Sequence, residues 1–251
     1  MGGSICFKCK YRGGWKMNKT KIEYCDYTWN FVTGCLHGCS YCYARRISQR
    51  FNRSFTPSFH PERLEEPLKL KKPSIIFAVD MGDLFGSWVP REWIESGLEI
   101  MRKAYWHKFI LLTKNPKRLI EFSYPPNVWL GITIDTQRRV EGLKYLLQTD
   151  AQVKYISFEP LLEKININLH GVDWIIIGAQ TRPEKQPEKE WVDLLIKQAN
   201  MLKIPVFLKN NLKYPIKRQE MPFCREFERE HSVDVDVDGY IRCDKGVLEE
   251  R

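Results

Sequence analysis

The sequence predicts an α/β protein, built as a full or partial parallel (β/α) barrel of six to seven βα units. Short apolar runs alternate with segments whose apolar residues recur at helical spacing, a pattern typical of βα repeats. The length of 251 residues suits one such barrel better than two domains. An open doubly wound sheet satisfies the same pattern and is the alternative fold.

The repeat begins with a strand near 27–32, followed by a helical stretch at 44–51. Segment 74–81 is a short, β-branched apolar run, as expected for a buried parallel strand. The later strands are expected at 109–114, 128–135, 153–160, 173–180 and 205–210, and the helices at 91–104, 116–122, 138–148 and 190–202. Because helices separate the strands, the sheet should be parallel with right-handed crossovers.

The first sixteen residues differ from the rest of the chain. Residues 1–16 show no periodicity and precede a second methionine, Met17, so we interpret them as a non-native or disordered leader. The alternative is that Cys6 and Cys9 form half of a zinc or second-cluster site. The leader holds four basic and no acidic side chains, so the net charge falls from +9 to about +5 without it.

The rest of the chain divides into two expected parts. Residues 17–215 should form the barrel, and 216–251 a C-terminal extension. Within that extension, alternating valines and aspartates lead to an Asp238-Gly239 turn, which predicts a short hairpin.

Composition narrows the class of protein. No apolar run approaches the length of a membrane span, and no signal peptide is recognisable. Eight cysteines in a long chain without a secretion signal favour reduced thiols and a metal site over disulfides. We therefore expect a cytoplasmic protein, for which a nucleic-acid partner is possible but not favoured by the charge.

Polar residues follow the predicted strands at their carboxyl ends, where parallel α/β folds bind ligands. Any buried strand must end in polar residues, but six successive strands with the same change favour a shared site. These residues are Asp80, Gly82, Asp83, Thr113, Lys114, Thr133, Asp135, Ser157, Glu159, Gly178, Gln180, Lys209 and Asn210.

Three cysteines stand close together just before the helical stretch at 44–51. Cys35, Cys39 and Cys42 have the spacing C-x3-C-x2-C. A structural zinc would need a fourth ligand, for which Cys25 is a candidate. Three thiols can instead bind three irons of a 4Fe–4S cluster and leave the fourth iron open to a ligand. The tight spacing favours the cluster.

At these residues the chain resembles the radical S-adenosylmethionine (SAM) superfamily. The superfamily signature is C-x3-C-x-aromatic-C on the loop after the first strand, and Tyr41 supplies the aromatic residue here. The resemblance implies a partial (β/α) barrel, a 4Fe–4S cluster on the three cysteines, and SAM on the open iron. It also implies reductive cleavage of SAM, hydrogen abstraction from a substrate, and an external electron donor of the flavodoxin or ferredoxin type.

The same resemblance suggests residues that bind SAM. The loop that usually reads Gly-Gly-Glu corresponds to Met81-Gly82-Asp83, so Gly82 and Asp83 are expected to hold the amino group. Thr133 and Asp135 are candidates for the ribose, although Asp135 could instead cap a helix. Tyr41 would pack near the adenine, or would simply cover the cluster.

Several further stretches, among them 80–85 and 129–137, resemble a phage and bacterial branch of the superfamily known as a domain of unknown function. That likeness suggests a queuine lyase that releases preQ1 from a small, nucleobase-like substrate, with Glu159 and Lys209 as catalytic residues. Two other classes remain open. One is a radical SAM enzyme that acts on nucleic acid or protein, and the other is a non-catalytic phage module that binds zinc or DNA.

Overall fold

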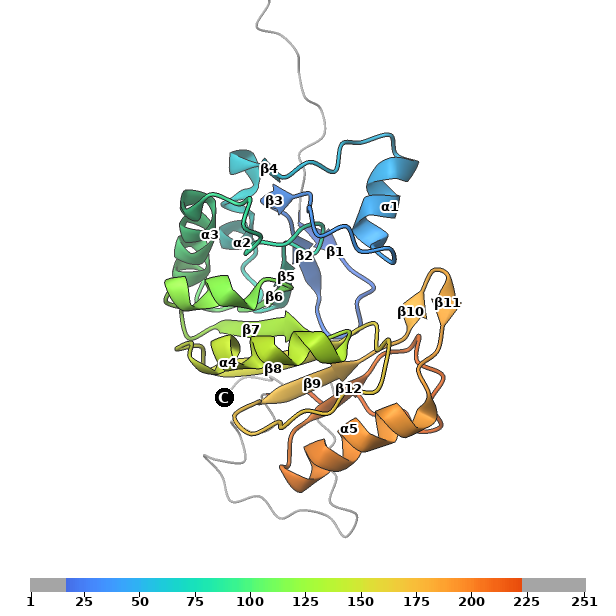
Figure 1. The fold of residues 1–251 in the computed structure, drawn as a ribbon. Coiled ribbons are helices and arrows are strands. Elements are labelled where there is room, and N and C mark those ends of the chain that lie inside the picture. Colours follow the sequence, from blue (N-terminus) through green and yellow to red (C-terminus); the bar gives the residue numbers. More distant parts are fainter. Residues whose placement is uncertain (1–16, 223–251) are drawn as a thin grey trace, which may run out of the picture.

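The computed structural model describes residues 17–222 and shows a mixed α/β fold around one large sheet (Figure 1). In that range the strands of this sheet follow the order β1-β2-β5-β6-β7-β8-β9-β12. Every pair from β2 to β12 is parallel, and β1 pairs antiparallel with β2. The predicted series of parallel βα units is therefore present.

The strands of the large sheet are β1 (Asn18–Lys19), β2 (Tyr27–Trp29), β5 (Ile75–Ala78), β6 (Lys108–Thr113), β7 (Val128–Thr133), β8 (Val153–Phe158), β9 (Trp174–Ile177) and β12 (Val206–Leu208). Two small antiparallel sheets add β3 (Val32–Thr33) with β4 (Ser58–Phe59), and the hairpin of β10 (Gln180–Thr181) with β11 (Glu184–Lys185). The α-helices are α1 (Tyr43–Arg50), α2 (Glu66–Lys69), α3 (Arg91–Lys103), α4 (Leu143–Leu147) and α5 (Lys189–Met201). The 3-10 helices are η1 (Pro61–Arg63), η2 (Pro116–Glu121) and η3 (Gln137–Gly142).

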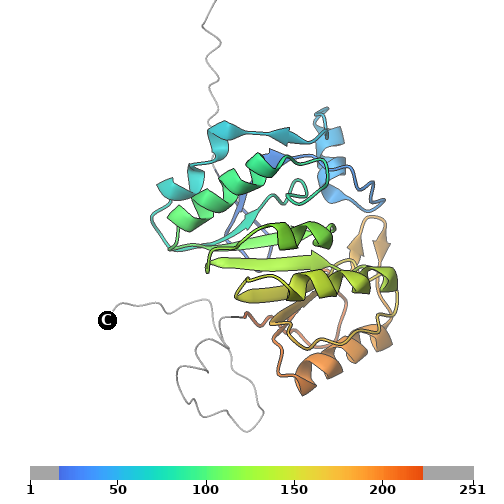
Figure 2. The same ribbon diagram turned by 60° about the vertical axis from the view of Figure 1, so that its left-hand side comes forward.

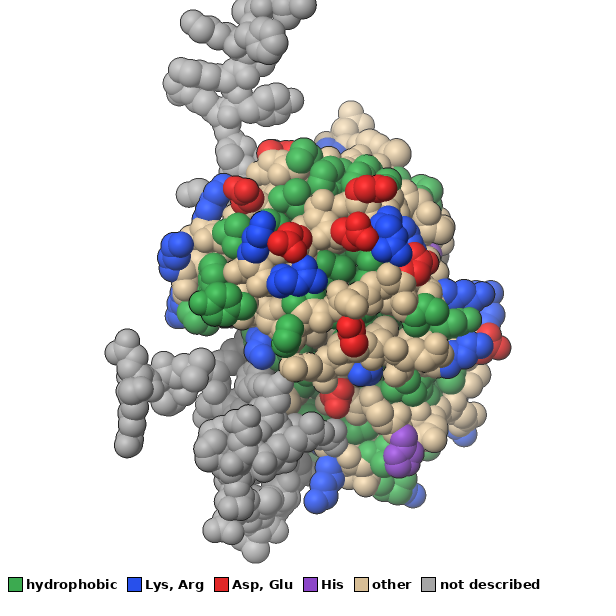
Figure 3. Space-filling model, turned by 90° about the vertical axis from the view of Figure 1, so that its left-hand side faces the viewer, with side chains coloured by type: hydrophobic (Ala, Val, Ile, Leu, Met, Phe, Trp, Pro, Cys, Tyr) green, Lys and Arg blue, Asp and Glu red, His purple; other side chains and the backbone are tan. Residues whose placement is uncertain are grey.

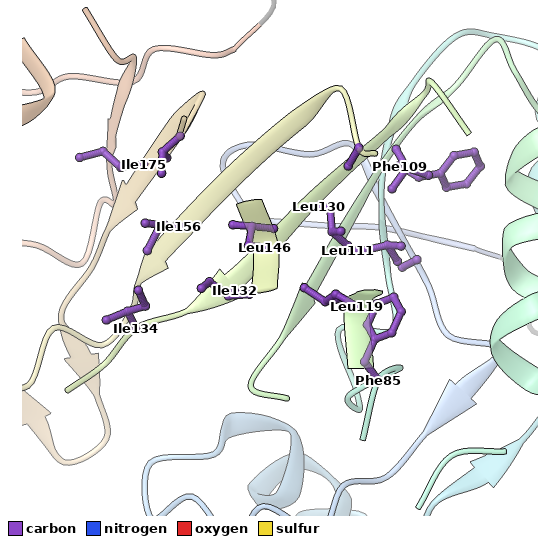
Figure 4. Close-up of a cluster of buried hydrophobic side chains, with 14 of the residues drawn as sticks. Phe85, Phe109, Leu111, Leu119, Leu130, Ile132, Ile134, Leu146, Ile156 and Ile175 are labelled. Carbon is purple, nitrogen blue, oxygen red and sulfur yellow. The ribbon is translucent and has the colours of Figure 1, made fainter. Parts of the chain in front are cut away.

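Alternate residues of each strand face two different layers. One set packs against α3, α4 and α5, which lie along the outside of the sheet (Figure 2). Strand residues of this helix-facing layer include Phe109, Leu111, Leu130, Ile132, Ile156 and Ile175 (Figure 4). The other set forms a separate, largely aromatic cluster that we call the inner face, with Phe77, Ile110, Trp129, Tyr155, Trp174 and Phe207 from the strands. Side chains alternate along each strand, so the residues at the strand ends that point to the same side as the inner face lie close to one another.

The inner face is tightly filled beneath the strand ends. Tyr155 is fully buried and donates a hydrogen bond from its hydroxyl to the Leu111 carbonyl at 3.1 Å. Its ring lies across Gly131, where a Cβ atom would come within 2.2 Å of the ring. Only glycine leaves room for this packing. The aromatic layer thus forms a solid floor below the polar residues.

The sheet does not close into a full barrel within residues 17–222. Its two outermost parallel strands, β2 and β12, do not pair, because each already has an antiparallel neighbour. Strand β1 lies along β2, and residues 218–220 lie along β12, with the Leu208 amide 2.7 Å from the Arg218 carbonyl. The ends of the sheet meet through side chains instead, since Tyr24 contacts Phe207 edge to face at 5.6 Å. Of the predicted full or partial barrel, the parallel α/β sheet is confirmed, and closure is not seen within the described residues.

Two of the predicted helices take a tighter form. Segment 116–122 becomes the 3-10 helix η2, and segment 138–148 divides into η3 and α4. The leader and the predicted C-terminal hairpin lie outside the described residues. No helix within residues 17–222 is long and apolar enough to cross a membrane.

Candidate functional site

The three cysteines lie between β3 and α1, and the start of their loop is joined to the loop after β5. The Gly34 amide donates to the Met81 carbonyl at 2.9 Å, and Gly34 and Gly82 form an isolated parallel bridge. Gly34 has a φ of +86°, and a Cβ at Gly82 would lie 3.0 Å from the Gly34 carbonyl oxygen. Gly82, predicted as a SAM contact, therefore also allows the cysteine loop to approach the sheet.

Asp83 makes the second connection to this loop. Its carboxylate lies 2.7 Å from the His37 ring and accepts hydrogen bonds from the Thr113 hydroxyl at 2.7 Å and the Lys114 amide at 2.9 Å. It also accepts from the Phe85 amide at 3.1 Å. The Asp83 side chain is 5% exposed. These four bonds fill the usual capacity of a carboxylate, so Asp83 holds the cysteine loop through His37.

The donor set of the loop suits an iron–sulfur cluster. Cys35, Cys39 and Cys42 are partly buried and form no disulfide. Burial raises the pKa of the Cys35 thiol to about 12, and negative charge on Asp83 and the other two cysteines acts in the same direction. Such a thiol becomes an anionic ligand when a metal centre displaces its proton. Soft sulfur donors match iron–sulfur chemistry.

The arrangement fits a mononuclear metal less well. Within residues 17–222, no three His, Cys, Asp or Glu side chains come close enough to hold a single metal ion. In a 4Fe–4S cluster each thiolate binds a different iron, so three spaced thiols fit that group. Cys25, the fourth ligand considered for zinc, instead lies buried in the inner face.

Tyr41 and Asp135 belong to one polar network. The Tyr41 hydroxyl donates to the Asp135 carboxylate, and Lys114 Nζ lies 2.7 Å from the Tyr41 oxygen and 3.0 Å from Asp135. Arg139 completes the network, with its Nε 2.7 Å from Asp135. Burial alone would raise the pKa of Asp135, but Lys114, Tyr41 and Arg139 hold it below its ordinary value. Asp135 is therefore an anion held in place by three neighbours.

Thr133 and Ser157 lie next to one another on β7 and β8. They are partners in the parallel register, and both are in phase with the inner face. Ser157 is 1% exposed, and its hydroxyl has no hydrogen-bond partner within the described residues. A buried hydroxyl without a partner is costly unless a ligand or water completes it. Thr133 is also buried.

Glu159 and Lys209 are brought together as predicted for residues of a shared site. Lys209 Nζ lies 3.5 Å from Glu159 and 2.8 Å from Glu23. Burial alone would lower the pKa of Lys209, but the charges of Glu159 and Glu23 outweigh it and raise that pKa. Gly178 makes room for the pair, because a Cβ there would lie 2.9 Å from Glu159 Cγ and 3.1 Å from Lys209 Cγ.

The Glu159 carboxylate is less completely engaged. Lys209 is its one polar partner among residues 17–222, and the Glu159 side chain is 26% exposed. Its charge nevertheless reaches the inner face, where it is second only to burial in raising the pKa of Tyr24. This carboxylate can therefore accept hydrogen bonds from a ligand.

Sequence reasoning did not assign roles to several residues of these networks. His37 and Glu23 gave no signal as partners, since each contacts a residue distant in the sequence. Arg139 lies only four positions after Asp135, and that spacing could have indicated the ion pair. Lys114 was noticed as a strand end but not as the link between Tyr41 and Asp135. Its parity with Ile110 and Leu112 on β6 is the signal that could have directed it to the inner face.

One of the strand-end residues expected in the shared site, Asp80, contacts two further elements of the fold. Asp80, at the end of β5, accepts a hydrogen bond from the Asn30 amide at 2.6 Å. The Tyr43 hydroxyl lies 2.6 Å from the Asp80 carbonyl, which ties α1 to the strand end. Gln180 does not join the networks described above, and its side chain donates to the Pro183 carbonyl. Asn210 joins the group of Glu23, Lys209 and Glu159 through its backbone amide, which donates to Glu23 at 2.9 Å.

Solved structures of spore photoproduct lyase share this fold. A double mutant of that lyase with bound AdoMet and dinucleoside spore photoproduct aligns with a TM-score of 0.50 and 12% identity, over 88% of this chain and 66% of that chain. Another complex of the lyase with dinucleoside spore photoproduct gives a TM-score of 0.46 and 12% identity, over 75% of this chain and 65% of that chain. The chain thus covers about two thirds of these lyases, and the likeness at this identity is one of fold.

Sequence comparisons give the family. No curated protein matches the chain. The family model described as "Protein of unknown function (DUF5131)" matches residues 19–233, which is most of the chain. The chain therefore belongs to the DUF5131 family.

Proposed function

We propose that the protein is a radical SAM enzyme in which Cys35, Cys39 and Cys42 hold a 4Fe–4S cluster. The observation that carries this proposal is the position of the cysteine loop, fixed by its glycine bridge and by His37 at the carboxyl ends of parallel strands. When bound, the reduced cluster would supply an electron that cleaves SAM into methionine and a radical that abstracts hydrogen. The fold is that of a lyase with bound AdoMet.

The chain's own residues would position SAM beside this loop. Gly82 and Asp83 are the proposed neighbours of its amino group, and Thr133 and Asp135 of its ribose. Both carboxylates are already hydrogen-bonded within the protein, so their main task is to keep the loop and the Tyr41 ring in place. SAM would then bind to a loop and a tyrosine ring that are already in position, which lowers the entropy cost of binding.

The substrate would lie over the inner face, beside Glu159, Lys209 and Ser157. Glu159 offers acceptor positions, and the Ser157 hydroxyl needs a partner. A small planar molecule with N–H donors meets both requirements, and the aromatic floor suits a base. We therefore propose a nucleobase-like substrate, specifically queuine. Hydrogen abstraction from its cyclopentenediol would leave a carbon radical on that ring. Cleavage of the C–N bond, with uptake of one proton from solvent and one electron from the external donor, would then release preQ1 and the five-membered ring.

Charge favours a small substrate over a polymer. The full sequence has a net charge of +9, from 40 basic and 31 acidic residues. Apart from four arginines between residues 45 and 53, this excess is spread over the sequence, and phosphate-backbone binding draws on a larger basic surface. Intact nucleic acid is therefore the second choice of substrate.

The cluster is tested by anaerobic reconstitution with iron and sulfide. We expect about four irons per chain and SAM-dependent formation of 5′-deoxyadenosine. Replacing Cys35, Cys39 or Cys42 by alanine should abolish both the iron chromophore and SAM cleavage. The matched control is Cys25→Ala, which should retain both. Cleavage that survives in any one of the three variants would overturn the assignment.

The substrate is tested by adding candidates to the reduced enzyme with SAM. Queuine should stimulate 5′-deoxyadenosine formation and yield preQ1. Dinucleoside spore photoproduct and tRNA serve as alternative probes, the former because proteins of this fold bind it. Stimulation by either of these but not by queuine would leave the cluster in place and replace the small-molecule substrate.

A further inference from the structure

Helix α1 has an exposed apolar stripe directly after the cysteine loop. Tyr43, Ile47 and Phe51 recur every four residues and so share one side of the helix. They are 44%, 42% and 59% exposed, and Leu36, inside the cysteine loop, is 58% exposed. Large apolar side chains gathered in this way on a surface usually mark an interaction site.

The segment that carries this stripe has basic side chains and no acidic ones, although the Tyr43 hydroxyl also lies 3.2 Å from the Asp80 carboxylate. No Asp or Glu occurs between Asp26 and Glu62, whereas the same stretch contains Arg45, Arg46, Arg50 and Arg53. Within residues 17–222, the structure shows no ion pair for the first three of these arginines. A surface of this composition attracts a negatively charged partner.

The four arginines have different tasks. Arg45 and Arg46 turn inward and donate to backbone carbonyls of the cysteine loop and of the β10–β11 hairpin. Arg50 and Arg53 remain exposed and lie over the Phe51 ring, with their guanidinium carbons 5.8 and 5.5 Å from its centroid. The stripe is thus apolar at its centre and positive at its edge, as protein interfaces are.

Helix α3 shows the contrast. Its exposed surface mixes both signs of charge (Figure 3). Arg91 pairs with Glu95 at 2.8 Å, and Arg102 with Glu99 at 2.7 Å. Those charges neutralise one another along the helix. The lack of acidic residues in the segment that contains α1, residues 27–61, is therefore not a general property of the chain.

We propose that the α1 surface, formed by Leu36, Tyr43, Ile47 and Phe51 with Arg50 and Arg53, docks an acidic one-electron donor protein. This inference rests on the proposed function, in which the cysteine loop holds a cluster that must be reduced. The α1 surface includes part of that loop, and α1 begins immediately after Cys42, so a donor seated here would lie next to the cluster. Complementary shape and charge would bring the redox centre of the donor close to the cluster before electron transfer.

A nucleic-acid strand fits this surface less well. Of its two aromatic rings, Phe51 already has Arg50 and Arg53 over it, and Tyr43 is bound through its hydroxyl to the Asp80 carbonyl. Leu36 and Ile47 are aliphatic and offer no flat ring on which a base could stack. Two of the four arginines are already engaged by backbone carbonyls, which leaves few contacts for phosphates. Two exposed arginines beside an apolar stripe suit the rim of a protein interface instead.

The test compares a protein donor with a chemical one. The variants are Phe51→Asp with Arg50→Glu, combined, and Ile47→Asp alone. Met201→Asp, at the exposed end of α5, and Arg102→Glu, on α3, are the matched controls. Each protein receives its cluster, and 5′-deoxyadenosine formation is driven either by an acidic flavodoxin or by dithionite. Binding of the flavodoxin is measured separately by fluorescence anisotropy.

We expect the α1 variants to lose about tenfold in flavodoxin affinity and in the flavodoxin-driven rate, with the dithionite-driven rate unchanged. The controls should match the parent in both assays. Equal flavodoxin binding by parent and variants would overturn the proposal, as would variants that lose binding of a single-stranded oligonucleotide but keep the flavodoxin-driven rate. A parent that binds flavodoxin but does not cleave SAM with dithionite would instead contradict the proposed function.

Discussion

Two carboxylates at the carboxyl ends of the sheet differ in what surrounds them. Asp83 is 5% exposed and interacts with four groups of the protein, from His37 to Lys114. Glu159 is 26% exposed and has Lys209 as its polar partner among the described residues, at 3.5 Å. Both residues follow buried parallel strands and look alike in the sequence. Their surroundings give them different tasks.

The difference in hydrogen bonding indicates that Asp83 stabilises the fold, whereas Glu159 is available to bind a ligand. A carboxylate whose acceptor positions are filled fixes the groups that donate to it. Asp83 in this way keeps the cysteine loop on the sheet. A carboxylate with free positions is desolvated without full compensation, and a ligand can restore the missing bonds. Glu159, with the unpartnered Ser157 hydroxyl on the same strand, is such a position.

The largest effect should come from exchanging each carboxylate for its amide. Asp83→Asn places an N–H group against donors such as the Lys114 amide, and we expect a loss of about 3 kcal/mol in the free energy of unfolding. Glu159→Gln keeps an acceptor and faces one donor, so we expect about 0.5 kcal/mol. Urea unfolding of both variants without metal checks the comparison. Equal losses would show that the two carboxylates do not differ as described.

A smaller, pH-dependent effect is expected at Asp135. Because the pKa of this group is below its ordinary value, its contribution to stability is complete above about pH 4 and is lost as the pH falls through the lowered pKa. Asp135→Asn should cost about 2 kcal/mol at neutral pH. The gap between variant and parent should narrow toward pH 2.5, as measured by urea unfolding. A gap that is constant with pH would assign the loss to packing.

The smallest effect should come from two hydroxyl groups. Thr113→Val removes a hydrogen bond to Asp83 and should cost about 1.5 kcal/mol. Ser157→Ala removes a hydroxyl that has no partner among the described residues, and should leave stability unchanged or slightly higher. Thermal unfolding of the two variants side by side sharpens the distinction. A clear loss for Ser157→Ala would mean that its hydroxyl is bonded in solution.

The parallel sheet could be predicted from the sequence because its signal is local. The strands expected at 109–114 and 128–135 match β6 and β7 closely, since continuous apolar runs with β-branched residues mark buried parallel strands. Closure of the barrel could not be predicted. It depends on which segments lie along the two outer strands, and the segment at 218–220 carries no strong strand signal.

For the candidate site, the sequence indicated candidate residues but not the contacts among them. Spacing identified the three cysteines, and position after a strand identified Asp83 and Glu159. Their position after a strand could not show that the Asp83 carboxylate accepts four hydrogen bonds while the Glu159 carboxylate retains free acceptor positions. The donors to Asp83 include a ring 46 positions earlier and an amide 31 positions later, and these approach it only through the fold.

The bridge between Gly34 and Gly82 also links the cysteine loop to the formation of the sheet. Its two glycines are 48 positions apart, and the pairing of β2 with β5 closes nearly the same stretch of chain. The shape of the cysteine loop therefore depends on a contact with a distant strand end. Under the proposed function, a mutation that weakens the pairing of β2 with β5 would also displace the loop and lower the cluster content.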